Sequence, residues 1–152
     1  MLGSSSPYRQ ALPSYRSRRF ILLVLSLLLT ISGCYWLKYS KLMRTHVDLL
    51  LSMSQKMSDL LEDRRTISPT MMNEFSYPLD RARDFVRIVG QRYAQRRSLQ
   101  AFTQFLDVYA ELVKETDRLR VLQGESSGFH ERVDALRKKG EEVKAILAEE
   151  EK

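Results

Sequence analysis

The chain of 152 residues has few of the residues that usually build catalytic and metal centres. It contains one cysteine and two histidines, so no internal disulfide can form. His46 and His130 are far apart, and neither has a cysteine or an acidic pair at ligand spacing. No glycine-rich phosphate loop is present, and no nucleophile has a neighbouring base. These absences predict a protein that is not an enzyme and that uses no metal or cofactor.

Glycine and proline are scarce, with six and four residues, and no segment alternates apolar and polar side chains as a half-buried strand does. Apolar residues instead recur at helical spacing. Ser68 and Ser98 are predicted N-caps, and Pro78 is predicted to interrupt a helix. The predicted helices cover residues 35–62, 70–76, 78–95, 98–122 and 129–149. The fold class is therefore all-α, either an up-down helical bundle or antiparallel coiled-coil hairpins.

Each predicted helix has one apolar face, which we expect to form the core. In the last helix this face is a narrow seam interrupted by Gly140, which marks either a close helix crossing or a weak point. The main stripe residues are Tyr39, Met43, Val47, Leu50, Met57, Leu61, Leu79, Ala82, Phe85, Val86, Val89, Tyr93, Leu99, Phe102, Phe105, Leu106, Tyr109, Leu112, Leu119, Phe129, Val133, Leu136, Val143 and Leu147.

One long uncharged run, FILLVLSLLLTISGCYWL, occupies residues 20–37. It follows a leader, residues 1–19, that holds four arginines and no acid and is predicted to be disordered. Basic residues before a hydrophobic run hold that end on the cytoplasmic side, which places the body of the chain across the membrane. The predicted organisation is a basic leader (1–19), a hydrophobic signal or anchor segment (20–37) and a helical bundle domain (38–152).

Two kinds of anchor fit this segment. Eighteen helical residues rise about 27 Å, which is the short end of a membrane span. Alternatively, Ile31-Ser32-Gly33-Cys34 resembles the lipobox of bacterial lipoprotein precursors, in which the cysteine is lipidated and becomes the mature N-terminus. That resemblance implies a signal peptide and a lipid on Cys34. It covers these four residues at the end of the hydrophobic region, and we recognise no family motif in the rest of the chain.

Six arginines gather in residues 80–97 against two aspartates. The planar guanidinium suits phosphate and carboxylate partners, so this group is a candidate site for an anionic surface such as lipid headgroups, acidic glycans or an acidic protein. The alternative is a solvated helix face whose arginines pair with acids of the next helix, such as Asp107 and Glu111. The candidate residues are Arg81, Arg83, Arg87, Arg92, Arg96 and Arg97.

These patterns predict a membrane-anchored, extracytoplasmic (periplasmic) binding or scaffold protein of the bacterial envelope, held by membrane lipid. We expect a protein partner or self-association. The net charge of +6 is concentrated in the leader, so a nucleic-acid partner is not expected, and no small-molecule substrate is indicated. The alternative is a single-pass transmembrane protein with a helical sensor or complex-subunit domain.

Overall fold

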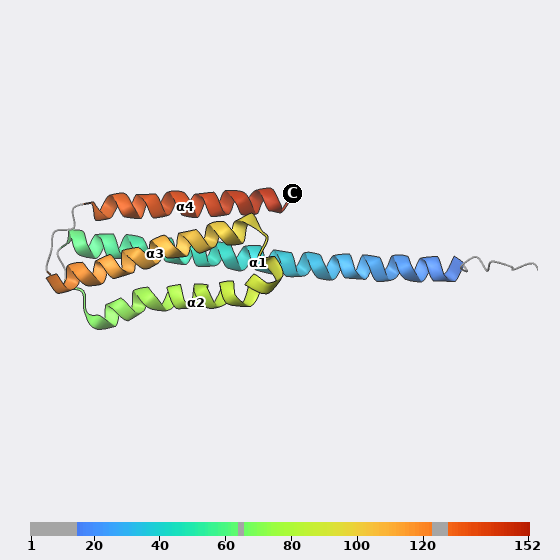
Figure 1. The fold of residues 1–152 in the computed structure, drawn as a ribbon, viewed down its shortest axis with the longest axis horizontal. Coiled ribbons are helices and arrows are strands. Elements are labelled where there is room, and N and C mark those ends of the chain that lie inside the picture. Colours follow the sequence, from blue (N-terminus) through green and yellow to red (C-terminus); the bar gives the residue numbers. More distant parts are fainter. Residues whose placement is uncertain (1–14, 64–65, 123–127) are drawn as a thin grey trace, which may run out of the picture. The chain divides into compact units, whose positions relative to one another are not determined.

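The computed structural model describes the backbone of residues 15–63, 66–122 and 128–152, and the side chains from residue 38 onward in these ranges except Leu122. The described residues form four helices and no strand, which confirms an all-α bundle (Figure 1). The chain divides into two compact units, residues 1–38 and residues 39–152, and the second unit is the bundle. The helices are α1 (Tyr15–Glu62), α2 (Pro69–Tyr93), α3 (Arg97–Leu122) and α4 (Phe129–Glu150).

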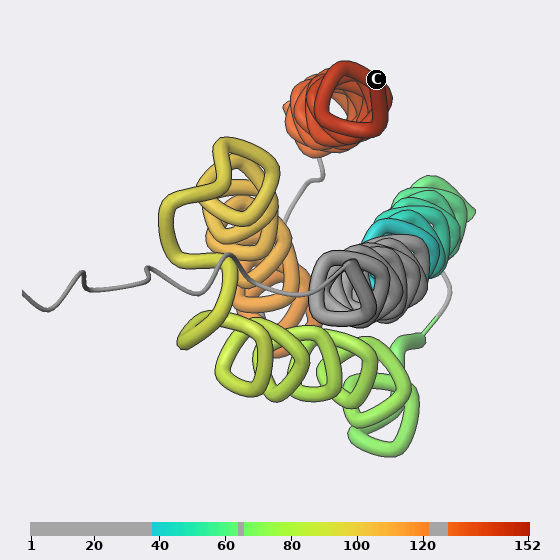
Figure 2. The backbone as a smooth tube through the Cα atoms, turned by 90° about the vertical axis from the view of Figure 1, so that its right-hand side faces the viewer, coloured from blue at the N-terminus to red at the C-terminus, as the bar shows by residue number. Residues whose placement is uncertain are grey.

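Contacts between helix ends define the topology of the bundle. The Tyr39 ring lies 4.4 Å from the ring of Tyr93 at the end of α2, and its hydroxyl lies 3.0 Å from Ser98 Oγ at the start of α3. At the other end, Ser58 of α1 meets His130 at the start of α4. The helices therefore alternate in direction, and α1 stands diagonally opposite α3 (Figure 2). We call the end that contains Tyr39 the anchor-side end, because Tyr39 follows the hydrophobic segment in the sequence.

The core follows the predicted apolar stripes, with small departures at their edges. Leu61 is half-buried, whereas the neighbouring Leu60 is buried. Leu61 lies eighteen residues, or five helical turns, beyond the buried Met43 and so on the same side of α1, but it is the penultimate residue of the helix, where the bundle covers it less. In α2, Val86, Val89 and Tyr93 are also half-buried, so the second half of this helix covers the core less completely than its first half.

The predicted break at Pro78 is wrong, because α2 continues through this residue. Pro78 is buried and lacks the N–H that would bond the carbonyl of Glu74. One residue later, the Phe75 carbonyl accepts a hydrogen bond of 3.0 Å from the Tyr109 hydroxyl of α3. This tertiary contact holds the turn that the proline weakens. The predicted N-cap is confirmed at Ser68, whose Oγ accepts from the Met71 N–H at 3.2 Å.

Ser98 is not an N-cap, because α3 begins one residue earlier, at Arg97. Its hydroxyl donates instead to Glu150 Oε2 of α4 at 2.7 Å. Since that bond uses the only hydroxyl hydrogen of Ser98, the Tyr39 hydroxyl donates to Ser98 Oγ. Burial raises the pKa of Tyr39 to about 12, so the phenol keeps its proton. This buried chain joins α1, α3 and α4 at the anchor-side end.

Gly140 marks a close helix crossing, one of its two predicted roles. A Cβ at this position would lie 3.0 Å from Leu51 Cδ1, 3.2 Å from Val47 Cγ1 and 3.3 Å from Phe105 Cε2. The absence of a side chain therefore lets α4 settle against α1 and α3, and the seam of α4 is occupied within the same chain.

Candidate interaction surfaces

The hydrophobic segment 20–37 and the lipobox cysteine, Cys34, lie outside the residues whose side chains are described, although their backbone belongs to α1. From residue 38 onward, no described helix is long and apolar enough to cross a membrane. Lipidation of Cys34 and membrane spanning by residues 20–37 both remain predictions.

All six predicted arginines are exposed, but the fold does not gather them on one face. Arg81 and Arg92 are eleven residues apart, about three helical turns, and so share one side of α2. Arg83 and Arg87 share another side, because a step of two residues turns about 200° around a helix. The last two, Arg96 and Arg97, lie at the anchor-side end, in the α2–α3 turn and at the start of α3.

The arginines of this group differ in their partners. Arg87 pairs with Asp84 of its own helix at 3.0 Å, and Arg97 lies 3.6 Å from Glu149 of α4. Arg81 and Arg83 make no ion pair within the described residues. The acids predicted as alternative partners do not take this role: Glu111 binds Lys114, and no ion pair joins Asp107 to the arginines in the described parts. In the parts of the chain that the structure describes, neither Asp107 nor Glu111 therefore pairs with these arginines.

A second surface emerges from the apolar residues that the bundle leaves exposed. Within the described residues, five large hydrophobic side chains are exposed, and four of them border the junction of α1 and α2. The fifth lies at the end of α3. They are Leu42 (49% exposed), Leu49 (40%), Tyr77 (64%), Ile88 (74%) and, at the end of α3, Val121 (63%).

The α1 border of this junction is a line at heptad spacing. Leu42, Leu49 and Lys56 are seven residues apart, so they lie on one side of the helix. The Nζ atom of Lys56 lies 3.0 Å from Glu74 Oε2 of α2, which orients this side toward α2. Leu42 and Leu49 therefore face the junction and not the outer surface opposite it.

The α2 border has the same character. Glu74, Tyr77, Arg81 and Ile88 follow one another at steps of three, four and seven residues, which is one side of a helix. Because Glu74 binds Lys56 of α1, this side faces α1. We call the surface between the two borders the α1–α2 groove.

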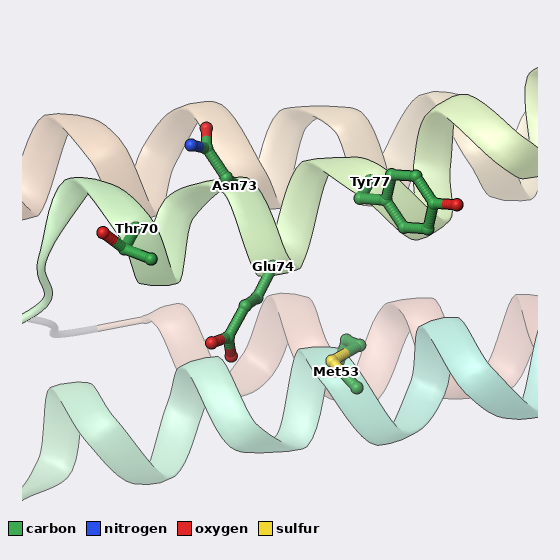
Figure 3. Close-up of a pocket in the computed structure, with 5 residues that line it drawn as sticks. All are labelled: Met53, Thr70, Asn73, Glu74 and Tyr77. Carbon is green, nitrogen blue, oxygen red and sulfur yellow. The ribbon is translucent and has the colours of Figure 1, made fainter.

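A pocket of about 470 Å³ opens at one end of the α1–α2 groove. Met53 of α1 and four residues of α2 line it, and Figure 3 shows Glu74 reaching from α2 toward α1, where Met53 lies. The other lining residues are Thr70, Asn73 and Tyr77. The groove is thus hollowed at the end opposite the anchor-side end, with apolar and polar walls.

His46 lies on α1 between the two ends of the groove. Its ring centroid is 5.3 Å from that of Phe85 and 6.3 Å from that of Phe102. Burial lowers its pKa below the ordinary 6.5, and the positive charge of Arg81 lowers it further. His46 is therefore neutral at pH 7, and Arg81 supplies positive charge at this point of the groove.

The second histidine takes part in a contact between helices. His130 Nδ1 lies 3.0 Å from Glu62 Oε1 and 3.1 Å from Ser58 Oγ, both on α1. Across the described ranges, no three histidine, cysteine, aspartate or glutamate side chains are placed to hold a metal ion.

Comparison with known proteins adds no relative: the chain matches no family model, and no curated protein or solved structure is significantly similar to it. The functional argument therefore rests on the surfaces of this chain.

Sequence reasoning missed the α1–α2 groove. Its signal was present, because Leu42, Leu49, Tyr77 and Ile88 are apolar residues at helical spacing that lie beside the core stripes and not on them. A second line of apolar residues along an amphipathic helix indicates a second apolar surface, beside the core, that a further helix or another molecule can cover.

Proposed function

We propose that this protein is a membrane-anchored, extracytoplasmic helical bundle that works as a binding or scaffold protein. The observation that carries the proposal is the order of the segments: the hydrophobic segment 20–37 directly precedes a helical bundle formed by residues 39–152. A hydrophobic segment directly before a folded bundle suits a protein whose task is to hold a binding surface at the membrane.

Binding is favoured over catalysis by the use that the fold makes of its polar groups. Several of the buried polar side chains that we describe join helices to one another, as Ser58, Ser98 and Thr116 do. What the bundle offers to other molecules is an apolar groove and a set of exposed arginines. Both features suit recognition of a surface, and neither supplies a positioned nucleophile or base.

Either anchor is followed directly by the bundle in the sequence. Only four residues separate Cys34 from Tyr39, so a lipid on Cys34 or a span ending near Leu37 leaves little chain between the anchor and the bundle. The second candidate function, a transmembrane sensor or complex subunit, uses the same bundle with the spanning anchor.

Intact mass and acyl labelling of the membrane form test the anchor. Lipidation predicts a mature chain that begins at Cys34, carries acyl groups and is converted to an unlabelled precursor by Cys34→Ser. A chain that begins at Met1, takes up no acyl label and resists extraction from membranes would favour the spanning alternative. A chain that is recovered in the aqueous fraction would refute anchoring altogether.

The arginines at the anchor-side end give a separate test of contact with the envelope surface. Neutralising Arg92, Arg96 and Arg97 together should weaken binding to anionic vesicles, and salt should have the same effect. Neutralising Arg81, Arg83 and Arg87, which lie on α2 further from this end, removes the same number of charges and is the matched control. Equal loss in both variants would mean that overall charge, and not this end of the bundle, attracts the vesicles.

A further inference from the structure

We propose that the α1–α2 groove binds an acidic amphipathic helix of a partner protein. The inference goes beyond anchoring, because it depends on the side chains of the bundle and holds for a lipidated and for a spanning chain. It starts from the concentration of exposed apolar residues along this one junction, where four of the five in the described residues lie.

The shape of the groove selects a helix. Its borders are two antiparallel helices, so the described backbone here offers no sheet edge to which an extended peptide can add. Apolar side chains recur along each border at seven or eleven residues, which is two or three helical turns. From Leu42 to Lys56 the α1 border is about 21 Å long. A partner helix of about 14 to 18 residues, with anchors at positions i, i+3, i+4 and i+7, matches this length and spacing.

The charge of the groove selects an acidic helix. Three basic residues, Lys56, Arg81 and Arg92, lie along its borders with two acids, Glu74 and Asp84, and each acid pairs with a basic residue. Lys56 and Glu74 neutralise each other at 3.0 Å, and Arg81 makes no ion pair within the described part of the chain. An acidic partner would supply the carboxylate that Arg81 lacks, whereas a second copy of the same groove would oppose Arg81 with another arginine.

Electrostatic neighbours of Arg81 strengthen this selection. His46 is the titratable group that faces Arg81 from α1. Because its pKa is lowered, its imidazole is neutral at neutral pH and adds no second positive charge beside Arg81. Asp84, one turn along α2, is occupied by Arg87 at 3.0 Å. The positive charge at the middle of the groove is therefore available to a ligand, between apolar positions at Tyr77 and Ile88.

The test uses the full-length protein in detergent or nanodiscs and two synthetic helical peptides of 18 residues. Both peptides carry leucine at i, i+3, i+4 and i+7, and they differ in having glutamate or lysine beside this stripe. Fluorescence anisotropy should give an affinity for the acidic peptide more than about tenfold above that for the basic peptide. Raised salt should reduce the difference.

Variants locate the binding on the molecule. Ile88→Glu should reduce acidic-peptide affinity by about tenfold or more, and Arg81→Glu should reverse the preference in favour of the basic peptide. Val121→Glu changes another exposed apolar residue outside the groove, and Arg83→Glu changes an arginine off its borders that makes no ion pair within the described residues, so both should leave the preference unchanged. All four positions are exposed, and thermal unfolding checks that each variant is folded.

Four results would overturn the proposal. Equal affinity for the two peptides would remove the charge selection. Equal loss in Ile88→Glu and Val121→Glu would show that the groove is not the site. A dimer in analytical ultracentrifugation that Ile88→Glu dissociates would make a second copy the occupant, and binding of neutral lipid vesicles lost in the same variant would make it lipid. Failure of lipidation or spanning leaves these outcomes unchanged, so the two proposals are tested separately.

Discussion

The two sides of α1 differ in how completely they are covered. On the side of α4, Gly140 allows α4 to contact α1 at van der Waals distance. Ion pairs between these two helices, such as Lys144–Asp48 and Arg44–Glu151, add to this contact. On the side of α2, Lys56 pairs with Glu74, and the apolar side chains of Leu42 and Leu49 remain partly exposed beside this pair. The same helix is thus closely covered along one edge and less covered along the other.

Substitutions at two residues of α1, Val47 and Leu49, compare the two sides directly. Val47 is fully buried on the side of α4, whereas Leu49 is 40% exposed in the groove. Val47→Asp should cost several kcal/mol, about 3–5, because it buries a charge without a partner, and it should unfold a small bundle. Leu49→Asp should cost less than about 1 kcal/mol. Urea unfolding followed by circular dichroism checks both. Similar losses would mean that the groove is as much a part of the core as the side of α4.

The glycines of α4 and α2 provide a second matched pair. Gly140→Leu should destabilise the bundle by about 1–3 kcal/mol, since its side chain meets Leu51, Val47 and Phe105. Gly90→Ala should instead stabilise by up to about 1 kcal/mol, because a Cβ there meets nothing within 4 Å and alanine favours the helix. The measurement is the free energy of unfolding. A neutral Gly140→Leu variant would contradict the close crossing.

The buried hydrogen-bond chain at the anchor-side end should have a smaller effect. Ser98→Ala removes the link between the Tyr39 hydroxyl and the Glu150 carboxylate and should cost about 1–2 kcal/mol. Ser98→Thr keeps the hydroxyl and serves as the control for its chemistry. Amide exchange near the C-terminus should accelerate in the alanine variant. Unchanged exchange and stability would mean that the chain of bonds does not hold α4 in place.

Lowering the pH should cause the smallest of these losses in the free energy of unfolding, through protonation of His46 beside the groove. Because the pKa of His46 is lowered in the fold, the unfolded state binds more protons between that lowered pKa and 6.5. Stability therefore falls as pH drops below 6.5, and this part of the loss should disappear in His46→Phe. Arg81→Gln should raise the pKa of His46, because one positive neighbour is removed. An NMR titration of the imidazole measures both, and an unshifted His46 would contradict its burial.

The parts of this fold that sequence predicts are those fixed by local rules. The Ser68 N-cap and the buried stripes follow from side chains a few residues apart. The missing side chain of Gly140 indicated either a close crossing or a weak point, and the contacts of α4 show the close crossing. Pro78 and Ser98 were misjudged because their environments depend on distant residues. Tyr109 is 34 positions from the carbonyl that it binds in α2, and Glu150 is 52 positions from Ser98. Local propensity carries no information about such contacts.

The same distinction applies to the candidate sites. The arginine group was visible as composition, but its division between sides of α2 and the anchor-side end follows from helical rotation and the position of the turn. The α1–α2 groove depends on which apolar residues find a partner, and that is decided by the pairing of whole helices. The sequence alone therefore does not distinguish a buried hydrophobic residue, such as Val47, from an exposed one, such as Ile88.

Because the four helices of the bundle alternate in direction, its C-terminal end lies beside the beginning of its first helix. Arg44 near the start of the bundle and Glu151 near its end are joined at 2.8 Å, although 107 positions separate them. A donor dye near residue 41 and an acceptor after Lys152 would therefore be in close range only while all four helices are assembled. One energy-transfer signal between these two positions would therefore report whether the bundle is folded.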